Sequence, residues 1–393
     1  MNVLFLTPRL PFPPLRGDQV VAFHRLRLLS SRHEISLLSF YEQPTELAGL
    51  DVLQPYCASI DVVQLHRKRA VARVLAGART GLPFQVLYYG SRAYRERLRE
   101  LLATRQFDVA HAYFLRMAQY LDELAAAKVV DAMDSLVLRL GRLADATRGL
   151  RRAAYRAELQ RVTPYERALP DVADEVIVVS PQDRSFFPGD RVTVVENGVD
   201  TETFAPRGRR PETPTVAFTG NMGYGPNVDA AVWFATRCFP RVRERVPDAR
   251  FVIAGDRPSR AVRALAPLAG VTVTGRVASI ADVLNDSRVA VVPLQAGSGI
   301  QNKVLEAMAC GVPVVTTRIG AGGLSVVPDA HLLVEDEPGA FADAVAGLLA
   351  SSQRAEELGA AGRAFVVSAH SWDSAADAVD EVYRRAAERR RRA

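Results

Sequence analysis

Apolar residues in this chain fall into short continuous runs, separated by longer segments with the spacing of amphipathic helices. Such runs are typical of strands buried on both faces of a parallel sheet. In the first half, the predicted strands are 3–7, 34–40, 61–65, 108–112, 129–132, 175–179 and 193–195. In the second half, they are 215–219, 250–254, 271–274, 289–293, 312–317 and 331–334. The alternation predicts an α/β protein with parallel sheets and crossover helices.

The two blocks of strands predict two domains. Residues 207–214 separate the two blocks. This segment is polar and contains Pro211 and Pro214, which is typical of a linker. We expect an N-terminal domain over 1–206, a second domain over 215–371, and a final helix over 372–393. A chain of 393 residues can bury two cores of ordinary size.

Composition narrows the classes of function. The net charge of +6 comes almost entirely from arginine, which we attribute to genome composition rather than to nucleic-acid binding. The three cysteines, Cys57, Cys238 and Cys310, are far apart in apolar contexts, which favours a reducing, cytoplasmic compartment over a disulfide framework or zinc site. The N-terminus predicts a strand and no signal peptide, and no segment approaches the ~20 apolar residues of a membrane span.

One stretch, Gly297 to Val315, combines a glycine turn, a short helix and a following strand. Gly299 lacks a side chain and permits close approach of a ligand to the backbone. The helix from about Asn302 points its free N–H groups at this turn, where an anion is favoured. Lys303 adds a positive charge, and Glu306 lies one turn further on the same face. Phosphate at the helix start and ribose one turn deeper would suit a sugar nucleotide, although a lysine and glutamate at this spacing are also common on solvated helices.

The segment Lys303-Val304-Leu305-Glu306-Ala307-Met308-Ala309-Cys310-Gly311-Val312-Pro313-Val314-Val315 resembles the donor-site signature of retaining glycosyltransferases of family 4. Glu306 matches the second glutamate of that family's paired motif, but Ser298 stands where the first is expected. The resemblance implies a GT-B fold, in which two Rossmann-like domains with parallel sheets face each other across a cleft. It also implies a donor on the C-terminal domain and an acceptor mostly on the N-terminal one.

The resemblance also implies individual site residues. Lys303, Glu306 and His111 are the expected catalytic residues. The expected donor-binding residues are Gly17, Asn221, Arg276, Val277, Ser298, Gly299, Ile300, Gln301, Lys303 and Glu306. No Asp-x-Asp sequence occurs, so no metal site is predicted. We expect Lys303 and helix N–H groups to stabilise the negative charge of the diphosphate instead.

The expected activity is metal-independent transfer of a sugar, with retention, from a nucleoside diphosphate sugar (UDP-, GDP- or dTDP-linked) to an acceptor hydroxyl. The acceptor could be a small molecule, a glycan or a lipid-linked molecule. A GT-B sugar-nucleotide epimerase and a catalytically silent binding protein remain alternatives. A dehydrogenase is disfavoured because no Gly-x-Gly-x-x-Gly follows the first strand. The basic helices over 67–99 and 384–392 are either solvated or in contact with the inner face of an anionic membrane.

Overall fold

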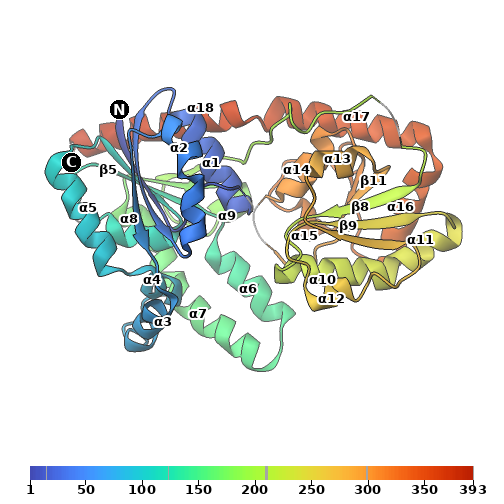
Figure 1. The fold of residues 1–393 in the computed structure, drawn as a ribbon, viewed down its shortest axis with the longest axis horizontal. Helices are drawn as coiled ribbons and strands as arrows, with labels where there is room; N and C mark the ends of the chain where they lie inside the picture. Colours follow the sequence, from blue (N-terminus) through green and yellow to red (C-terminus); the bar gives the residue numbers. More distant parts are fainter. Residues whose placement is uncertain (15, 123, 209–210, 298–299, 393) are drawn as a thin grey trace. The chain divides into compact units, whose positions relative to one another are not determined.

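The structure, a computed structural model, describes residues 1–14, 16–122, 124–208, 211–297 and 300–392. The chain divides into two compact units. Unit 1 comprises Met1–Glu196 and Trp372–Ala393, and unit 2 comprises Asn197–Ser371. Each unit has a parallel sheet with helices packed against it (Figure 1).

The sheet of unit 1 has seven strands in the order β3-β2-β1-β4-β5-β6-β7. Their bounds are β1 (Asn2–Thr7), β2 (Glu34–Tyr41), β3 (Ser59–Gln64), β4 (Val109–Tyr113), β5 (Ala127–Met133), β6 (Glu175–Val178) and β7 (Val192–Val194). All neighbouring pairs are parallel, so all the strands end at the same edge of the sheet. The central strands are buried on both faces, which explains their continuous apolar sequences.

The helices of unit 1 are α1 (Gly17–Leu29), α2 (Leu50–Leu53), α3 (Arg67–Ala76), α4 (Phe84–Tyr89), α5 (Arg92–Thr104), α6 (Leu136–Ala146), α7 (Gly149–Arg167), α8 (Leu169–Val172), α9 (Pro181–Arg184) and α18 (Trp372–Arg392). Short 3-10 turns cover Pro44–Gly49, Gln54–Tyr56 and Leu115–Tyr120. Helix α18, last in the chain, packs beside α1 because Trp372, Val379 and Tyr383 complete one of the two apolar layers of this unit.

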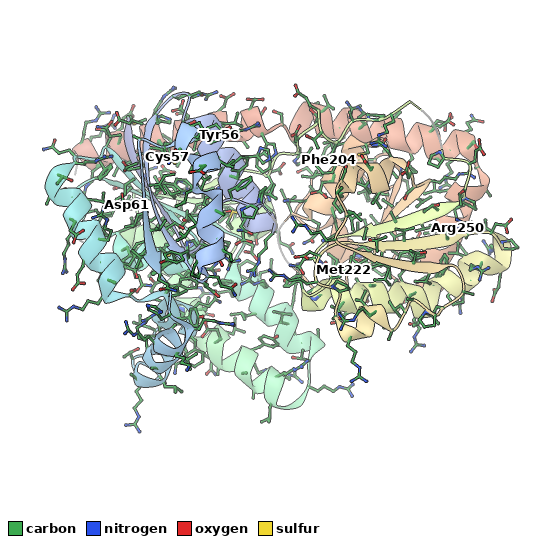
Figure 2. The ribbon with its side chains drawn as sticks, in the orientation of Figure 1. Tyr56, Cys57, Asp61, Phe204, Met222 and Arg250 are labelled. Carbon is green, nitrogen blue, oxygen red and sulfur yellow. The ribbon has the colours of Figure 1, made fainter. Side chains whose placement is uncertain are left out.

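The sheet of unit 2 has six strands in the order β10-β9-β8-β11-β12-β13. They are β8 (Thr215–Thr219), β9 (Arg250–Ala254), β10 (Val271–Gly275), β11 (Val289–Val292), β12 (Val314–Thr316) and β13 (Leu333–Val334). Met222 lies in the loop that follows β8, whereas Arg250 marks the opposite edge, where β9 begins (Figure 2).

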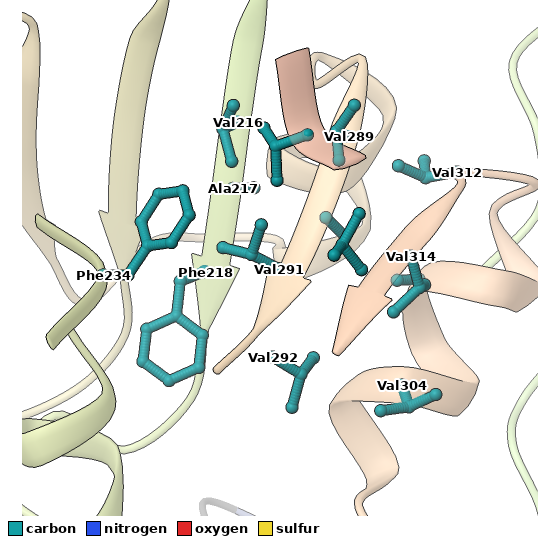
Figure 3. Packing of buried hydrophobic residues seen from close by; sticks show 14 of the residues in the cluster. Val216, Ala217, Phe218, Phe234, Val289, Val291, Val292, Val304, Val312 and Val314 are labelled. Carbon is teal, nitrogen blue, oxygen red and sulfur yellow. The ribbon is translucent and has the colours of Figure 1, made fainter. Parts of the chain in front are cut away.

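The helices of unit 2 are α10 (Gly225–Trp233), α11 (Phe239–Arg245), α12 (Arg260–Arg263), α13 (Ile280–Asn285), α14 (Asn302–Ala309), α15 (Arg318–Ala321), α16 (Pro338–Ala350) and α17 (Ser352–Ala369), with a π-helical turn over Phe234–Cys238. The core is built from small β-branched and aromatic side chains. Phe218 of β8, Val291 of β11 and Phe234 all belong to one buried cluster (Figure 3). Val304 of α14 is fully buried in the same cluster, which anchors the helix that carries Lys303 (Figure 3).

The strands lie within a few residues of their predicted positions. The segment after the first unit differs from the prediction, which ended the first domain at 206 and made 207–214 a linker. The structure groups these residues with unit 2 from Asn197 onward. The reason is pairing: Val199 forms a bridge with Ser371, and the backbone N–H of Arg207 donates to Asn285 Oδ1 at 3.0 Å.

Candidate functional site: the carboxyl edge of the unit 2 sheet

The strand order of unit 2 reverses direction at β8, which has β9 on one side and β11 on the other. In open parallel sheets, the connections on the two sides of such a switch point run to opposite faces of the sheet. A crevice then forms at the carboxyl ends of the strands. The loop 220–224 follows β8, and the loop that begins at Pro293 follows β11. The residues predicted to bind a donor are concentrated in these two loops and the helix after the second.

The backbone in this region is packed closely enough to require glycine. Gly220 and Gly255 have φ values of +145° and +146°. A Cβ on Gly255 would lie 1.7 Å from the carbonyl oxygen of Gly220, which no side chain could tolerate. The loops after β8 and β9 are therefore held against each other, and this contact fixes the loop that carries Asn221.

Lys303 of α14 reaches toward the loop after β8. Its Cε lies 3.3 Å from the position that a Cβ on Gly220 would occupy, and its ammonium donates to Gln301 Oε1 at 3.0 Å. The Lys303 side chain therefore lies against the backbone of the loop that follows β8. An anion bound beside the end of β8 could contact the Lys303 ammonium without a change in the backbone.

Glu306 lies one turn further along α14, half-buried like Lys303. Burial raises the pKa of the Glu306 carboxyl to about 7, against the opposing attraction of Lys303. Burial likewise lowers the pKa of the Lys303 ammonium to about 8, although Glu306 acts to raise it. Among the described residues, none donates a hydrogen bond to the Glu306 carboxylate. Its oxygens can therefore accept hydrogen bonds from hydroxyl groups of a ligand.

Two helix N-termini face the same edge of the sheet. Helix α14 begins after Gln301 and α10 begins after Tyr224, and neither has a side-chain cap. In α10, Pro226 has no N–H and the Asn227 N–H donates to the Tyr224 carbonyl, so the attraction for an anion comes mainly from the first turn of α14. Together with Lys303, this terminus would favour a phosphate or diphosphate group.

Two residues of the site were missed from the sequence. Asn227 in the first turn of α10 is 5% exposed, and its Nδ2 donates to the carbonyl of Asn221 at 3.0 Å. Asn197 Nδ2 donates to Asn302 Oδ1 at 3.3 Å and so connects the start of unit 2 to α14. Both are asparagines next to proline or glycine, which the sequence alone presents as ordinary turn residues.

The other predicted donor-binding residues occupy the same edge with different exposure. Ile300 is buried and Gln301 is half-buried, directly before α14. Arg276 is exposed and Val277 is half-buried, in the loop between β10 and α13. Ser298 and Gly299 lie outside the described residues, so their predicted roles stay predictions.

Two predicted site residues belong to unit 1. Gly17 is the exposed first residue of α1. His111, predicted to be catalytic, is 0% exposed in the middle of β4, where it stacks on Phe5 at 4.4 Å. Its Nδ1 lies 2.8 Å from the Tyr383 hydroxyl, and burial together with the charge of Arg25 keeps its pKa well below the usual value. His111 thus lies in the core of unit 1, two residues before the end of β4 at Tyr113, and its predicted catalytic role stays a prediction.

Among the described residues, no group of three or more His, Cys, Asp and Glu side chains is arranged to hold a metal ion. None of the described helices is both long and apolar enough to cross a membrane.

Comparison with known proteins identifies the fold first. The structure superimposes on sucrose-phosphate synthase from Thermosynechococcus elongatus with a TM-score of 0.73 over 98% of both chains, at 16% identity. It also matches Anabaena HepE, solved in complex with UDP-glucose, with a TM-score of 0.68 over 97% of this chain and 98% of that one, at 13% identity. The chain has the GT-B fold of these glycosyltransferase structures.

The sequence comparison then narrows the class. Residues 213–351 match the family model described as glycosyl transferases group 1. The chain is 34% identical over 243 residues to the GDP-mannose-dependent alpha-(1-6)-phosphatidylinositol monomannoside mannosyltransferase of Mycobacterium tuberculosis, covering 53% of this chain and 61% of the relative. It is 33% identical over 257 residues to alpha-maltose-1-phosphate synthase of Mycolicibacterium smegmatis, covering 56% and 65%. The matches thus span about six-tenths of the curated relatives, and they agree with the predicted resemblance to glycosyltransferases, here at the level of the group 1 family model.

Proposed function

We propose that this protein is a retaining glycosyltransferase that binds a nucleoside diphosphate sugar at the carboxyl edge of the unit 2 sheet. The observation that carries the proposal is the placement of Lys303 and Glu306 on one face of α14, beside the Gly220 loop at the switch point. The matched family model covers this region, and relatives are named for GDP-mannose while a structural neighbour holds UDP-glucose. The base and the sugar of this chain's donor are not assigned.

In the proposed reaction, the bond between the anomeric carbon and the diphosphate oxygen breaks, and a bond to the acceptor oxygen forms on the same face. The diphosphate leaves with the bonding electron pair, and the acceptor's proton passes to one of its oxygens. Lys303 and the first-turn N–H groups of α14 stabilise the charge that develops on the leaving group. Glu306 holds ribose hydroxyls, which keeps the donor in register with these groups.

The first test is substitution of the two α14 residues. Loss of a charge-assisted contact to phosphate is expected to cost on the order of 1.5–3 kcal/mol, so Lys303→Ala should lower kcat/KM about tenfold to a hundredfold or more. Glu306→Gln should raise KM for the donor. Donor binding by thermal shift against UDP-, GDP- and dTDP-sugars gives the direct measurement.

Arg237→Ala is the matched control, because Arg237 is an exposed basic residue of unit 2 outside the two loops and α14. Wild-type turnover in both α14 variants would remove the assignment. Product analysis without an acceptor separates a transferase from an epimerase, since only the epimerase would convert the sugar nucleotide under those conditions.

We propose further that transfer needs no divalent metal and retains the anomeric configuration. The motive for the first statement is that Lys303 and the uncapped N-terminus of α14 supply positive potential where a metal-dependent enzyme would hold its ion. Activity should persist in EDTA, and NMR of the fresh product should show the donor's anomeric configuration. An EDTA-treated enzyme that only manganese restores, or an inverted product, would contradict these statements.

A peripheral contact with an anionic membrane also belongs to the proposal. Helix α3 exposes Val71 and Leu75, at 51% and 72%, next to basic Arg67, Lys68 and Arg69. Apolar and basic groups together on a helix suit a negatively charged lipid surface. Co-sedimentation with phosphatidylglycerol vesicles should fall when Leu75 is replaced by Glu, and equal binding of both proteins would refute the contact.

A further inference from the structure

Three arginines follow the carboxyl ends of three adjacent strands of unit 1. Strands β1, β4 and β5 are neighbours in the centre of the sheet and end at Thr7, Tyr113 and Met133. Arg9 follows β1, Arg116 lies in the 3-10 turn after β4, and Arg139 lies in α6 after β5. Chain segments far apart in sequence thus bring three guanidinium groups to the edge of the sheet where open α/β folds bind ligands.

The three side chains are close enough to act on one another. Burial lowers the pKa of the Arg116 guanidinium, and the positive charges of Arg9 and Arg139 lower it further. Arg116 is 8% exposed, while the side chains of Arg9 and Arg139 are 26% and 27% exposed. Gathering like charges in a partly dehydrated place costs free energy unless an anion neutralises them.

Arg9 and Arg139 each form an ion pair with an aspartate, whereas Arg116 forms none among the described residues. Arg9 pairs with Asp18 at 3.2 Å, and Arg139 pairs with Asp134 at 3.5 Å. Within the described ranges, no carboxylate lies at ion-pair distance from Arg116. The middle arginine therefore forms no ion pair, although Tyr89 and Asp18 act to raise its pKa without offsetting the effect of burial.

Arg116 is held in place by neutral groups. Its Nη1 donates to Gln85 Oε1 at 3.1 Å, and its guanidinium lies over the ring of Phe114 at 4.0 Å and that of Tyr89 at 5.1 Å. The buried Nε has no hydrogen-bond partner among the described residues. A guanidinium fixed by stacking, with a donor unused, is preorganised for an oxyanion.

We propose that Arg9, Arg116 and Arg139 bind a phosphate group carried by the acceptor. This inference rests on the proposed transferase function and names the acceptor's chemical class, a phosphorylated alcohol or polyol. Planar guanidinium groups match phosphate oxygens bidentately, and a dianionic phosphate would relieve the repulsion among the three arginines. A free sugar or polyol phosphate and the phosphodiester of a lipid headgroup share this chemistry.

The binding test uses the full-length chain with orthophosphate as the probe. Titration calorimetry is done in the Lys303→Ala background, which removes the phosphate contact proposed for the donor site. Arg116→Gln in that background should weaken binding at least tenfold, or about 1.4 kcal/mol at 25 °C. Arg92→Gln is the control, because the Arg92 side chain is 92% exposed and pairs only with Glu96 among the described carboxylates. Equal affinity in the Arg116 and Arg92 variants overturns the proposal.

Two further arms separate the sources of the phosphate. Competition with D-inositol 3-phosphate against inositol tests a free phosphate monoester, and phosphatidylinositol vesicles against phosphatidylcholine vesicles test a lipid phosphodiester. A preference for the phosphorylated partner that Arg116→Gln abolishes supports the proposal in either arm and identifies the source. No such preference in both arms overturns it.

A folding control distinguishes loss of phosphate binding from loss of the native fold. If Arg116→Gln loses its cooperative thermal transition, Arg116→Lys and the more exposed Arg139→Gln replace it, and both should weaken phosphate binding. Donor binding by thermal shift should be unchanged in every arginine variant that carries native Lys303. Loss of donor binding in wild type would instead reject the transferase function, so the two failures are distinguishable.

Discussion

The two units share a parallel-sheet architecture but bury different chemistry. Unit 1 encloses charged side chains: Arg25, Asp61, Arg116, Asp131, Glu158, Glu166, Glu175, Asp183 and Asp380 are each less than 9% exposed. In the described part of unit 2, no Asp, Glu, Lys or Arg is buried to that degree, and the buried polar groups are neutral residues such as Asn227 and Thr316. Both units have apolar cores, but among the described residues only unit 1 adds buried charged side chains to them.

The clearest case in unit 1 joins its first and last helices to the sheet. Arg25 of α1 forms an ion pair with Asp131 of β5, and His111 Nε2 lies 3.4 Å from the same carboxylate. Tyr383 of α18 contacts the other side of His111 at 2.8 Å. This polar cluster crosses four elements, so it specifies how α1 and α18 pack, at the cost of dehydrating two charges.

The largest effect is expected from breaking this cluster. Asp131→Asn keeps the side-chain volume but leaves the Arg25 guanidinium buried without a counter-ion, so unit 1 should lose about 3–5 kcal/mol of unfolding free energy. The chain has two tryptophans, Trp372 in unit 1 and Trp233 in unit 2. Urea unfolding followed by fluorescence in a Trp233→Phe background therefore reports unit 1.

The matched measurement keeps Trp233 and replaces Trp372 with Phe, so that unit 2 is observed in the same Asp131→Asn protein. We expect the unfolding midpoint of unit 2 to be unchanged within error, because Arg25 and Asp131 both lie in unit 1. A loss below 1 kcal/mol in unit 1 would mean that the cluster is not the source of its stability.

The difference between the units also explains which features of the structure could be predicted from the sequence. The strands were predictable because a run such as Val289–Val292 must be buried on both faces. The placement of Lys303 and Glu306 on one face at the start of a helix was predictable because both residues lie within the short helix α14. The ion pair of Arg25 and Asp131 was not, because it joins residues more than a hundred positions apart, and no local pattern announces such a pair.

The buried position of His111 could not be predicted for the same reason. A histidine near the end of a predicted strand has the same local pattern whether it faces a ligand or the core. Only the packing of α18, which places Tyr383 against the ring, decides between them. The placement of Arg9, Arg116 and Arg139 at one sheet edge likewise could not be predicted until the strand order was known, because they come from three separate segments.

A second, smaller effect tests whether the buried charges of unit 1 make it pH-sensitive. Glu166 is 0% exposed, and burial raises its pKa to about 7, while hydrogen bonds from Ser135 Oγ and the Leu136 N–H oppose the shift. Asp183 is raised in the same direction, to about 6. A carboxyl whose folded pKa exceeds its unfolded pKa makes the folded state bind protons more tightly.

The sign of the pH dependence follows from that shift. The contribution of Glu166 to stability is fully present below its unfolded pKa of about 4.5 and is lost as the pH rises through about 7. Glu166→Gln should remove this dependence, so its stability relative to wild type should rise by about 2 kcal/mol between pH 5 and pH 8. Urea unfolding of unit 1 by Trp372 fluorescence at the two pH values measures it. A constant difference between the two proteins would show that Glu166 titrates normally.

The smallest effect is expected from the charges of unit 2, which lie on its surface. Arg245 of α11 pairs with Asp343 of α16 at 2.9 Å, with side chains 60% and 57% exposed. Exposed pairs contribute about 0–1 kcal/mol and are screened by salt, so Asp343→Asn should change unfolding of unit 2 by less than 1 kcal/mol. Trp233 is a suitable reporter, since its ring packs on Phe341 of α16 at 5.6 Å. In 1 M NaCl even this small difference should vanish, because the Debye length there is about 3 Å. A loss above 2 kcal/mol that persists in salt would show that unit 2 depends on ion pairs as unit 1 does, and the contrast between the units would fail.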